Sequence, residues 1–368
     1  MKLAIIGSRG YPYVYSGYET FVKELSERLV LKNIEVKVYC HKNLFTDRPR
    51  TVKGIELVYI PTIETKSLSQ LIHSFFSILH ACFTKTDIVL VVNAANGPFG
   101  IITRVFRKPT LINVDGLEWL RPKWKGLGAK YFYFSAKLAT RLYDVIITDA
   151  EEMRKVYLKE FNKDSTVIAY GANISPSVNP SLIKTFNLNP REYYLIVGRL
   201  IPDNNADLIV EGFIRSGSSK KLVIVGDVPY KDDYADSIKS KANSNIIFLG
   251  YITNSEILAE LYHNCFAYLH GHEFGGTNPT MLKAMSCNCA ILALDTVFNR
   301  EMLMNGNYGL LFEKNTAPLA ALIQQIEQKN DLIEEMRKTS VNGLTEKYNW
   351  DHITDAYISV LNKLVSGS

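Results

Sequence analysis

Residues 268–285, YLHGHEFGGTNPTMLKAM, carry the clearest chemical signal in this sequence. An apolar run is followed by a polar loop with Gly275 and Gly276, and then by a helix that begins near Pro279. Glycines let a backbone approach a ligand closely, and proline is favoured in the first turn of a helix. Because the N–H groups at the start of such a helix attract anions, the segment predicts an anion-binding loop.

A second strand-to-helix turn lies in residues 195–213, LIVGRLIPDNNADLIVEGF. The strand is expected to end at Gly198 and Arg199, and the following helix to open near Asp203. A guanidinium at this position can fork onto phosphate oxygens, and each such charge-assisted bond contributes about 1.5–3 kcal/mol. The alternative is a surface arginine that pairs with Asp203 or Asp227.

The first expected strand also ends in a glycine loop, within residues 3–29, LAIIGSRGYPYVYSGYETFVKELSERL. A helix should begin near Ser16 or Gly17, with Glu19 and Thr20 in its first turn, where negative charge and hydroxyl groups are favoured. The G-x-x-G spacing is compatible with a dinucleotide fold. The G-x-G-x-x-G fingerprint is missing, however, so NAD binding is disfavoured.

The third candidate is residues 113–126, NVDGLEWLRPKWKG, which start at an expected strand end. Asp115 and Glu118 are close enough in one loop for one of them to contact an acceptor hydroxyl. Trp119 and Trp124 offer flat apolar faces to a sugar or a lipid. The alternative is that Asp115 caps a turn and both tryptophans pack in the core.

A metal site is not expected. His270, His272 and Glu273 lie together at a strand end, but no third histidine follows at ligand spacing, and there is no persuasive Asp-x-Asp motif. If the bound anion is a diphosphate, its charge should therefore be neutralised by Arg199, backbone N–H groups and a helix N-terminus. The sequence predicts no cofactor and no obligatory cation.

Apolar runs alternate with amphipathic segments of helical length along the chain, as in a parallel sheet wound with helices. The first series of expected strands is LAIIG, VKVYC, IELVYI, DIVLVV, TLINV, DVIIT and TVIAY, and the second is YYLIVG, LVIVG, NIIFLG, FAYLH, AILAL and GLLF. The predicted domains are 1–173 and 191–348, joined by a Ser-, Pro- and Asn-rich linker at 174–190, with a helix in 349–368. Two Rossmann-like, doubly wound parallel sheets should face a ligand cleft.

Composition agrees with two globular domains. The 368 residues exceed the ~250–300 at which a single core stops growing, and 47% hydrophobic with 21% charged residues excludes a disordered chain. The first residues, MKLAIIGSRG, resemble neither a signal peptide nor a spanning helix. The five cysteines form no paired framework, so reduced thiols in a cytoplasmic protein are expected.

Positive charge is concentrated in the first half of the chain. Residues 1–180 contain 25 basic and 16 acidic side chains, against 17 and 21 in residues 181–368, so the first half should face an acidic partner. Basic and aromatic residues interleave after an apolar helix expected at 68–83; they are Arg121, Lys123, Trp124, Lys125, Lys130, Tyr131, Tyr133 and Lys137. Together these segments could bind an anionic membrane surface or a lipid-linked pyrophosphate. The alternative is that the charged run is a solvated face and that the apolar helix covers the sheet.

The strand-to-helix turns in residues 195–213 and 268–285 resemble those of retaining family-4 glycosyltransferases. That family has the Gly198-Arg199 turn, usually with a lysine five residues later, where this chain has Asn204. It also has two glutamates eight positions apart, the second in a Leu-Glu-Ala-Met context. Here Lys283 replaces that second glutamate, and Gly275 stands at the first position.

The Gly-Gly-Thr-Asn-Pro run, the first glycine loop and the Asp-Gly-Leu-Glu-Trp segment are similar to bacterial polysaccharide rhamnosyltransferases. The resemblance implies the GT-B architecture, with residues 349–368 crossing back to the N-terminal domain. The residues it implies are Asp115, Arg199 and Glu273 for catalysis, Arg9, Gly10, Gly17, Gly198, Asn204, Gly275, Gly276, Thr277, Asn278 and Lys283 for the donor, and Glu118, Trp119 and Trp124 for the acceptor.

Three explanations of Lys283 stay open: it pairs with a phosphate, it points to solvent while the ribose is held otherwise, or donor binding is weakened. An ammonium can only donate, whereas a carboxylate accepts from two vicinal hydroxyls. A donor with deoxyribose would lose fewer hydrogen bonds when lysine replaces glutamate, because it has no 2′-hydroxyl.

The resemblance implies a retaining transferase that moves a hexose, L-rhamnose from dTDP-β-L-rhamnose, onto a lipid-linked glycan in the synthesis of bacterial cell-surface polysaccharide. It would act in the cytoplasm or at the inner face of the plasma membrane, without a nucleic-acid partner. Three alternatives are a UDP- or GDP-sugar donor, a catalytically weakened scaffold protein, and an NAD-linked or epimerising enzyme on similar domains.

Overall fold

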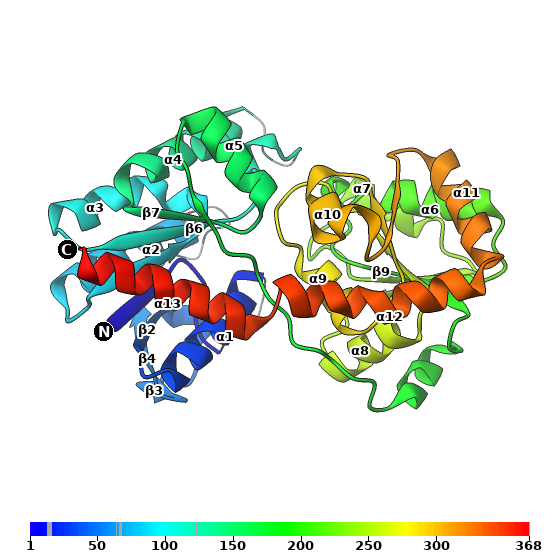
Figure 1. The fold of residues 1–368 in the computed structure, drawn as a ribbon, viewed down its shortest axis with the longest axis horizontal. Coiled ribbons are helices and arrows are strands. Elements are labelled where there is room, and N and C mark those ends of the chain that lie inside the picture. The colour runs from blue at the N-terminus through cyan, green and yellow to red at the C-terminus, as the bar shows by residue number, and fades with distance from the viewer. Residues whose placement is uncertain (13–16, 64, 66–67, 123, 125, 368) are drawn as a thin grey trace. The chain divides into compact units, whose positions relative to one another are not determined.

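The computed structural model describes residues 1–12, 17–63, 65, 68–122, 124 and 126–367. The chain forms two compact units, one of Met1–Tyr170 with Trp350–Ser368 and the other of Gly171–Asn349 (Figure 1). Each unit has its own sheet covered by helices. The predicted fold class, two Rossmann-like α/β domains, is confirmed.

The N-terminal unit is built on an eight-stranded sheet of order β3-β4-β2-β1-β5-β6-β7-β8. Its strands are parallel except for β3, which pairs antiparallel with β4. Their bounds are β1 Lys2–Ile6, β2 Glu35–His41, β3 Thr51–Val52, β4 Ile55–Ile60, β5 Ile88–Val92, β6 Thr110–Val114, β7 Val145–Thr148 and β8 Thr166–Val167. The central strand β5 is buried at every residue, as expected for a strand covered on both faces.

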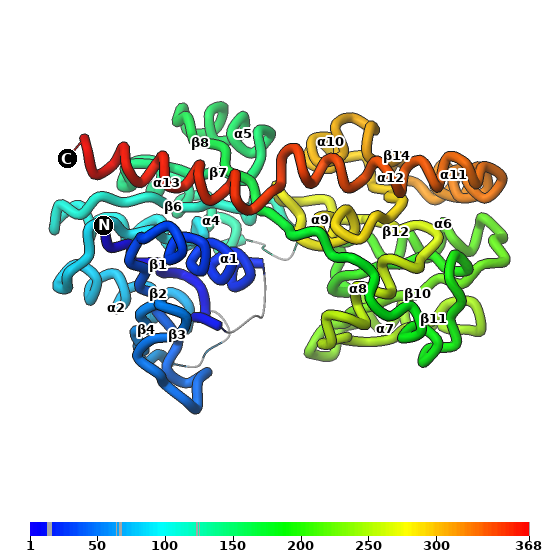
Figure 2. The backbone as a smooth tube through the Cα atoms, turned by 60° about the horizontal axis from the view of Figure 1, so that its bottom comes forward, coloured from blue at the N-terminus to red at the C-terminus, as the bar shows by residue number. Residues whose placement is uncertain are grey.

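Helices cover both faces of this sheet. They are α1 Gly17–Leu31, α2 Ser69–Phe83, α3 Gly100–Val105, α4 Leu127–Leu142, α5 Glu151–Phe161 and α13 Trp350–Ser366, with short 3-10 turns η1 Lys42–Leu44, η2 Ala94–Phe99 and η3 Glu118–Leu120. The connection from β1 through α1 to β2 runs across the sheet in one direction. The connections from β4 through α2 to β5 and from β6 through α4 to β7 run in the other direction. Because such connections are right-handed, α1 lies on one face of the sheet and α2 and α4 lie on the other. The terminal helix α13 packs along α1, as Figure 2 shows.

The C-terminal unit has a six-stranded parallel sheet of order β11-β10-β9-β12-β13-β14. The strands are β9 Tyr193–Val197, β10 Lys221–Val225, β11 Ile246–Gly250, β12 Ala267–His270, β13 Ile291–Leu294 and β14 Leu310–Phe312. The helices are α6 Ala206–Ser216, α7 Asp233–Lys239, α8 Ser255–Asn264, α9 Pro279–Ser286, α10 Val297–Met302, α11 Thr316–Glu327 and α12 Asn330–Lys347, with 3-10 turns η4 Pro180–Phe186, η5 Pro202–Asn204 and η6 Met304–Gly306. A buried apolar cluster joins the sheet to α6 and α11.

Every apolar run predicted as a strand forms one, although β8 has only two residues. The helix expected near Asp203 begins later, at Ala206, because residues 202–204 form a 3-10 turn and Asn205 has a left-handed backbone with φ of 49°. Ser16, named as a helix start, and the basic residues Lys123 and Lys125 lie outside the described residues.

The segment 171–190, which contains the predicted linker, is part of the C-terminal unit. Ile183 in η4 is fully buried. The buried carboxylate of Glu260 on α8 accepts hydrogen bonds from the Val178 N–H at 2.7 Å, the Asn179 N–H at 2.8 Å and the Ser177 hydroxyl at 2.8 Å. Burial alone would raise the pKa of Glu260, but these bonds outweigh it and lower the pKa.

All five cysteines are buried free thiols. Within the described ranges, no cluster of three histidine, cysteine or acidic residues could hold a metal ion, and no helix is long and apolar enough to cross a membrane.

Candidate functional site

Two strand-end loops meet at the carboxyl edge of the C-terminal sheet. Strands β9 and β12 are parallel neighbours, so the turn after Val197 and the loop after His270 emerge at the same edge. Two hydrogen bonds join them: the Asn205 side chain donates to the Gly271 carbonyl at 2.9 Å, and the Glu273 N–H donates to the Asp203 carbonyl at 3.1 Å. The edge therefore holds both anion-binding turns expected from the sequence in one place.

Arg199 stands exposed at the end of β9, directly after Gly198. Among the described residues, none forms a hydrogen bond or ion pair with its guanidinium. The alternative pairing with Asp227 is not present, because Asp227 is paired with Lys239 at 2.5 Å. Asn204 donates to the Arg199 carbonyl at 2.8 Å, so this predicted donor residue holds the turn in place.

The glycine loop leads directly into α9. Gly275 has φ of +114°, a backbone conformation that side-chain-bearing residues rarely adopt. Asn278 caps the helix by accepting hydrogen bonds from the Thr280 N–H at 3.0 Å and the Thr280 hydroxyl at 2.7 Å. Within the described part of the chain, no hydrogen bond engages the N–H groups of Gly275 and Gly276, and Thr277 beside them is buried. These N–H groups are available to an anion.

Glu273 is held by a cation that the sequence analysis did not identify. Its Oε2 accepts from the Lys314 ammonium at 2.5 Å and from the Asn205 amide at 3.3 Å. Lys314 follows β14 and is 41 positions away, so no local pattern could have predicted the pair. The lysine offsets the negative charge of Glu273 at an edge that would receive an anion.

His270 is buried at the end of β12 and keeps one ring nitrogen near the Tyr268 hydroxyl, at 3.0 Å. Burial lowers the pKa of His270 to about 3, so the ring is neutral at physiological pH. It stacks on His272 with ring centres 5.5 Å apart. His270 is thus a packed, uncharged part of the strand end.

Lys283 makes a contact that none of the three sequence explanations included. Its ammonium donates to the Ser175 hydroxyl at 2.9 Å. The Ser175 N–H donates to the Ser286 carbonyl at 3.0 Å, and the Ser175 carbonyl accepts from the His263 ring at 2.5 Å. Lys283 therefore ties the segment 171–190 to α9.

In the N-terminal unit, Asp115 follows β6 and lies in a buried polar network. The Tyr18 hydroxyl on α1 donates to one carboxylate oxygen, and the Tyr170 hydroxyl donates to the other at 3.2 Å. Burial raises the pKa of Asp115, although the bonds from Tyr18 and Tyr170 act in the opposite direction. A carboxylate with a raised pKa is a better proton acceptor, which suits contact with an acceptor hydroxyl.

The network continues to the end of the chain. Tyr170 also donates to Asn113 at 3.1 Å, and Asn113 donates to the Tyr357 hydroxyl on α13 at 2.9 Å. The terminal helix thus helps to position Asp115. Sequence reasoning missed Tyr18, Tyr170 and Tyr357, because their only signal is proximity in three dimensions.

The first glycine loop is braced by α1. The Arg9 N–H donates to the buried Glu19 carboxylate at 2.9 Å. Gly10 has φ of +125°, and a Cβ there would lie 2.8 Å from the Cys40 Cβ and Sγ atoms, so packing demands glycine. Gly17 is the first residue of α1.

A cavity of about 550 Å³ opens within the N-terminal unit between this loop, α2 and α4. Its lining includes Gly7, Arg9, Tyr18, Leu71, Asn93, Trp124, Tyr131 and Phe132. The lining is largely aromatic and aliphatic, with a few polar groups at the strand ends. Such a cavity can hold a sugar or an isoprenoid chain.

The two predicted tryptophans differ in their surroundings. Trp124 lines the cavity, and its ring N–H donates to Glu118 at 2.7 Å. The other oxygen of Glu118 contacts Arg121 at 3.1 Å, so Glu118 orients the Trp124 ring. Trp119 instead packs in an aromatic cluster with Tyr133, Tyr157 and Phe161, at ring-centre distances of 5.8–6.2 Å.

Comparisons with known protein families divide the chain between residues 173 and 180, close to the boundary between the two units at Tyr170 and Gly171. Residues 1–173 match the model of a domain of unknown function (DUF1972), and residues 180–343 match "Glycosyl transferases group 1". An uncharacterized glycosyltransferase, MJ1178 of Methanocaldococcus jannaschii, is 23% identical over 93% of this chain and 92% of its own length.

A Campylobacter jejuni relative is 27% identical over a third of each chain. It is named N-acetylgalactosamine-N,N'-diacetylbacillosaminyl-diphospho-undecaprenol 4-alpha-N-acetylgalactosaminyltransferase. The structure of Anabaena HepE, solved with UDP and glucose, covers 99% of this chain and 100% of its own at a TM-score of 0.79 and 14% identity. This chain is a glycosyltransferase enzyme with the two-domain GT-B fold, and its residues 180–343 match the "Glycosyl transferases group 1" model.

Proposed function

We propose that this transferase moves a hexose from a nucleotide-sugar donor to a lipid-linked glycan, with retention of the anomeric configuration. The observation that carries the proposal is the exposed Arg199 guanidinium, which emerges at the same sheet edge as the unengaged N–H groups of Gly275 and Gly276. A cation and convergent backbone N–H groups match the two phosphates of a nucleoside diphosphate. The UDP in the HepE structure supports a donor of this class.

We further propose L-rhamnose from dTDP-β-L-rhamnose as the donor. In this chain α9 offers the Lys283 ammonium at the place where the family has a carboxylate for the ribose, and that ammonium is bonded to Ser175. A donor without a 2′-hydroxyl loses fewer hydrogen bonds when that ribose-binding carboxylate is missing. A UDP- or GDP-sugar is the second candidate, and the UDP held by HepE favours the UDP form.

The acceptor is proposed to enter the cavity of the N-terminal unit. Trp124, Tyr131 and Phe132 supply aromatic faces for sugar rings or for the first units of a polyprenyl chain. The name of the C. jejuni relative, which includes a diphospho-undecaprenol acceptor, supports this class. Because such acceptors are embedded in lipid, we propose that the chain works at an anionic membrane surface, at the inner face of the plasma membrane.

The chemistry follows from the groups at the two sites. The departing diphosphate takes the acceptor's proton on the face it leaves, so no separate nucleophile is needed. Arg199 and the N–H groups of Gly275 and Gly276 stabilise the charge that develops on the diphosphate. Asp115, with its raised pKa, accepts a hydrogen bond from the acceptor hydroxyl and orients it.

The test is nucleotide release by the purified protein from a panel of dTDP-, UDP- and GDP-sugars, with and without a polyprenyl diphosphate glycan. We expect release that depends on the acceptor and is fastest with dTDP-rhamnose. Faster release from a UDP-sugar would replace the proposed donor but keep the mechanism. Absence of binding and of turnover with every donor would refute the proposal.

A further inference from the structure

Three neighbouring helical segments of the N-terminal unit carry no acidic residue. Residues 68–85, 94–109 and 126–142 contain α2, η2 with α3, and α4, and none of these stretches has an aspartate or glutamate. Their charged residues are all basic: Lys85, Arg104, Arg107, Lys108, Lys130, Lys137 and Arg141. Surface helices normally mix both signs of charge, so the positive charge of these segments favours contact with a negatively charged partner.

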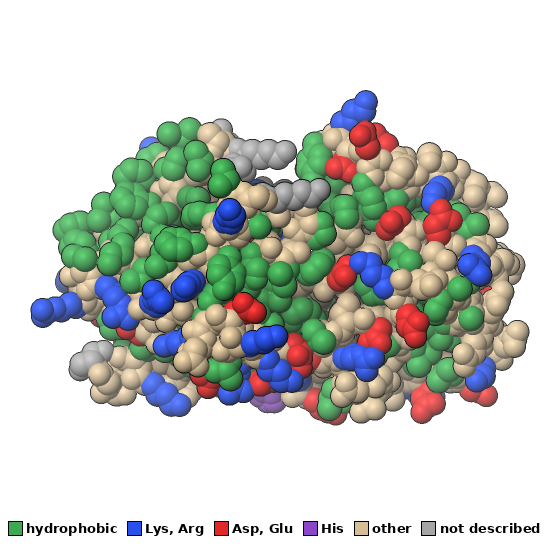
Figure 3. Space-filling model, turned by 90° about the horizontal axis from the view of Figure 1, so that it is seen from above, with side chains coloured by type: hydrophobic (Ala, Val, Ile, Leu, Met, Phe, Trp, Pro, Cys, Tyr) green, Lys and Arg blue, Asp and Glu red, His purple; other side chains and the backbone are tan. Residues whose placement is uncertain are grey.

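The same face exposes large apolar side chains. α2 packs against α3, and α3 against α4, so the three helices form one layer. Phe83 is 70% exposed, Val105 71%, Leu127 84% and Phe134 56%. Figure 3 shows a broad hydrophobic area on this unit with Lys and Arg side chains at its margin.

Two pairs of aromatic rings in this layer contact each other. Phe83 of α2 lies edge-on against Phe106 beyond α3, with ring centres 4.8 Å apart, and Phe75 contacts Phe99 at 5.9 Å. These contacts hold four of the aromatic side chains of the layer in fixed positions. Contiguous apolar surface of this kind marks an interaction site.

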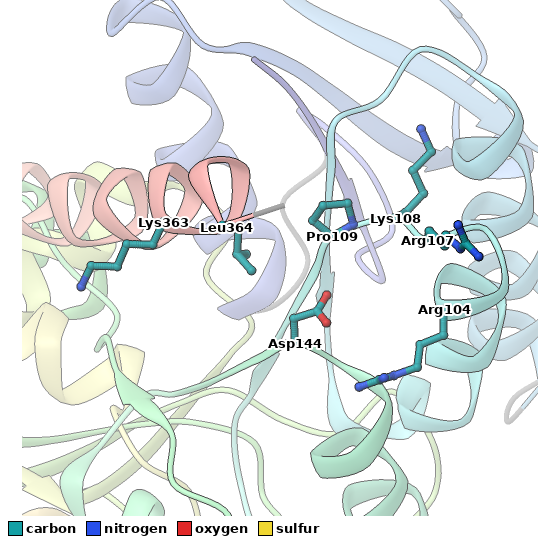
Figure 4. A pocket seen from close by; sticks show the side chains of 8 residues that line it. Arg104, Arg107, Lys108, Pro109, Asp144, Lys363 and Leu364 are labelled. Carbon is teal, nitrogen blue, oxygen red and sulfur yellow. The ribbon is translucent and has the colours of Figure 1, made fainter.

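A basic cavity of about 450 Å³ lies at the edge of this layer, between the end of α3 and α13. Its lining includes Arg104, Arg107, Lys108 and Lys363, against one acid, Asp144. Asp144 already accepts from the Thr110 N–H at 2.8 Å. In Figure 4 the basic side chains extend in different directions around the cavity, with Lys363 pointing away from Arg104. Charge spread in this way suits a layer of phosphate headgroups better than one small anion.

We propose that the face formed by α2, α3 and α4, with the basic cavity at its edge, docks on an anionic phospholipid bilayer. The apolar side chains enter the headgroup and acyl boundary, and the basic side chains contact lipid phosphates. This inference deepens the proposed function, on which its biological purpose rests. Leu71 of α2 and Phe132 of α4 line the proposed acceptor cavity, so the docked helices bring that cavity to the lipid.

The first test is cosedimentation of the full chain with vesicles, with no donor or acceptor present. We expect binding to vesicles of phosphatidylcholine with one part in three phosphatidylglycerol, and binding at least about tenfold weaker to pure phosphatidylcholine. Raising NaCl from 0.05 to ~0.5 M should weaken it further by screening. Equal binding to both vesicles, or no binding to either, would overturn the proposal, whereas failed glycosyl transfer would leave this result unchanged.

Two variants test the two halves of the surface. No described residue forms a hydrogen bond or ion pair with the Arg107 guanidinium or the Lys363 ammonium, so Arg107→Gln with Lys363→Gln should fold normally. Since each basic residue near an anionic surface contributes roughly fivefold, the pair should weaken vesicle binding about 25-fold. Phe83→Ser with Val105→Ser should weaken binding to anionic vesicles by at least about tenfold, because the inserted apolar area is lost.

The matched control is Ile214→Ser with Arg215→Gln on α6, where both side chains are exposed. This pair should bind vesicles like the wild type. A similar loss in the control and in the two test variants would contradict the proposed face. Inorganic phosphate at constant ionic strength should not displace the protein, and displacement at millimolar phosphate would assign the cavity to a free anion and overturn docking.

Discussion

Replacing Arg199 by alanine should weaken binding of the donor diphosphate without changing the fold. The guanidinium is exposed and has no partner among the described residues, so its removal leaves no buried group unsatisfied. Its carbonyl, which holds the turn through Asn204 and the Ile201 N–H, is kept in the variant. The change therefore isolates the contact between the side chain and phosphate.

The expected loss follows from the exposure of the side chain. Hydrogen bonds to a charged group contribute about 1.5–3 kcal/mol, and solvent screening at an exposed position favours the lower part of that range for the whole fork. At 1.4 kcal/mol per factor of ten, Kd should rise by about 10- to 30-fold. Arg199→Lys should recover only part of this loss, because an ammonium cannot form the planar fork.

Isothermal titration with dTDP and UDP measures the loss directly. Arg215→Ala is the control, since Arg215 is also exposed but lies nine residues along α6 from Ala206, about 13 Å from the sheet edge. It should titrate like the wild type. Unchanged Kd in Arg199→Ala would refute the donor site, and an equal loss in Arg215→Ala would reduce the effect to general electrostatics.

Three further predictions concern other parts of the two sites. Lys283→Glu should shift the UDP-to-dTDP affinity ratio toward UDP by about tenfold, because a carboxylate accepts a hydrogen bond from the 2′-hydroxyl. Ser175→Ala, which removes the partner of Lys283, is the control. A ratio equal to that of the wild type in Lys283→Glu contradicts the placement of Lys283 at the ribose. Tyr18→Phe removes a bond that lowers the pKa of Asp115, so the acidic limb of the kcat/KM profile should move to higher pH; an unmoved limb argues against Asp115 as the titrating group. Glu260→Gln should lower the free energy of unfolding by about 1.5–3 kcal/mol in urea denaturation at pH 7. Since the folded pKa of Glu260 is lowered, its contribution is present above the unfolded value of ~4.3 and is lost as pH falls through the folded pKa, so a difference that does not shrink as the pH is lowered below ~4.3 would count against it.

The strands could be predicted because most are buried on both faces and read as continuous apolar runs. β5 and β13, for example, have no exposed residue. The loops that follow them were predictable for the same reason, since parallel strands present their carboxyl ends at one edge. Arg199 and Gly275 are accordingly at the edge where the sequence placed them.

The partners of the site residues could not be predicted, because folding brings them together over long separations. Lys314 meets Glu273 across 41 positions, and Tyr357 meets Asn113 across 244. Neither pair has a local pattern. The role of Lys283 depends likewise on Ser175, 108 positions earlier.

Composition was a weaker guide than burial in the segment at 174–190. Its serines, prolines and asparagines are typical of a linker, yet Ile183 is buried and Glu260 binds the preceding backbone. The two tryptophans of the Asp115 loop carried the same signal in sequence. Only packing separates Trp124, which lines the cavity, from Trp119, which is enclosed by aromatic rings.

The most direct test of the central claim is the product itself. The purified chain would be incubated with dTDP-β-L-rhamnose and a short polyprenyl diphosphate glycan, and the lipid product analysed by mass spectrometry and by NMR of the new anomeric centre. We expect a mass gain of one deoxyhexose and the same anomeric configuration as in the donor. A product with the inverted configuration, or an acceptor unchanged in mass with every nucleotide sugar, would contradict it.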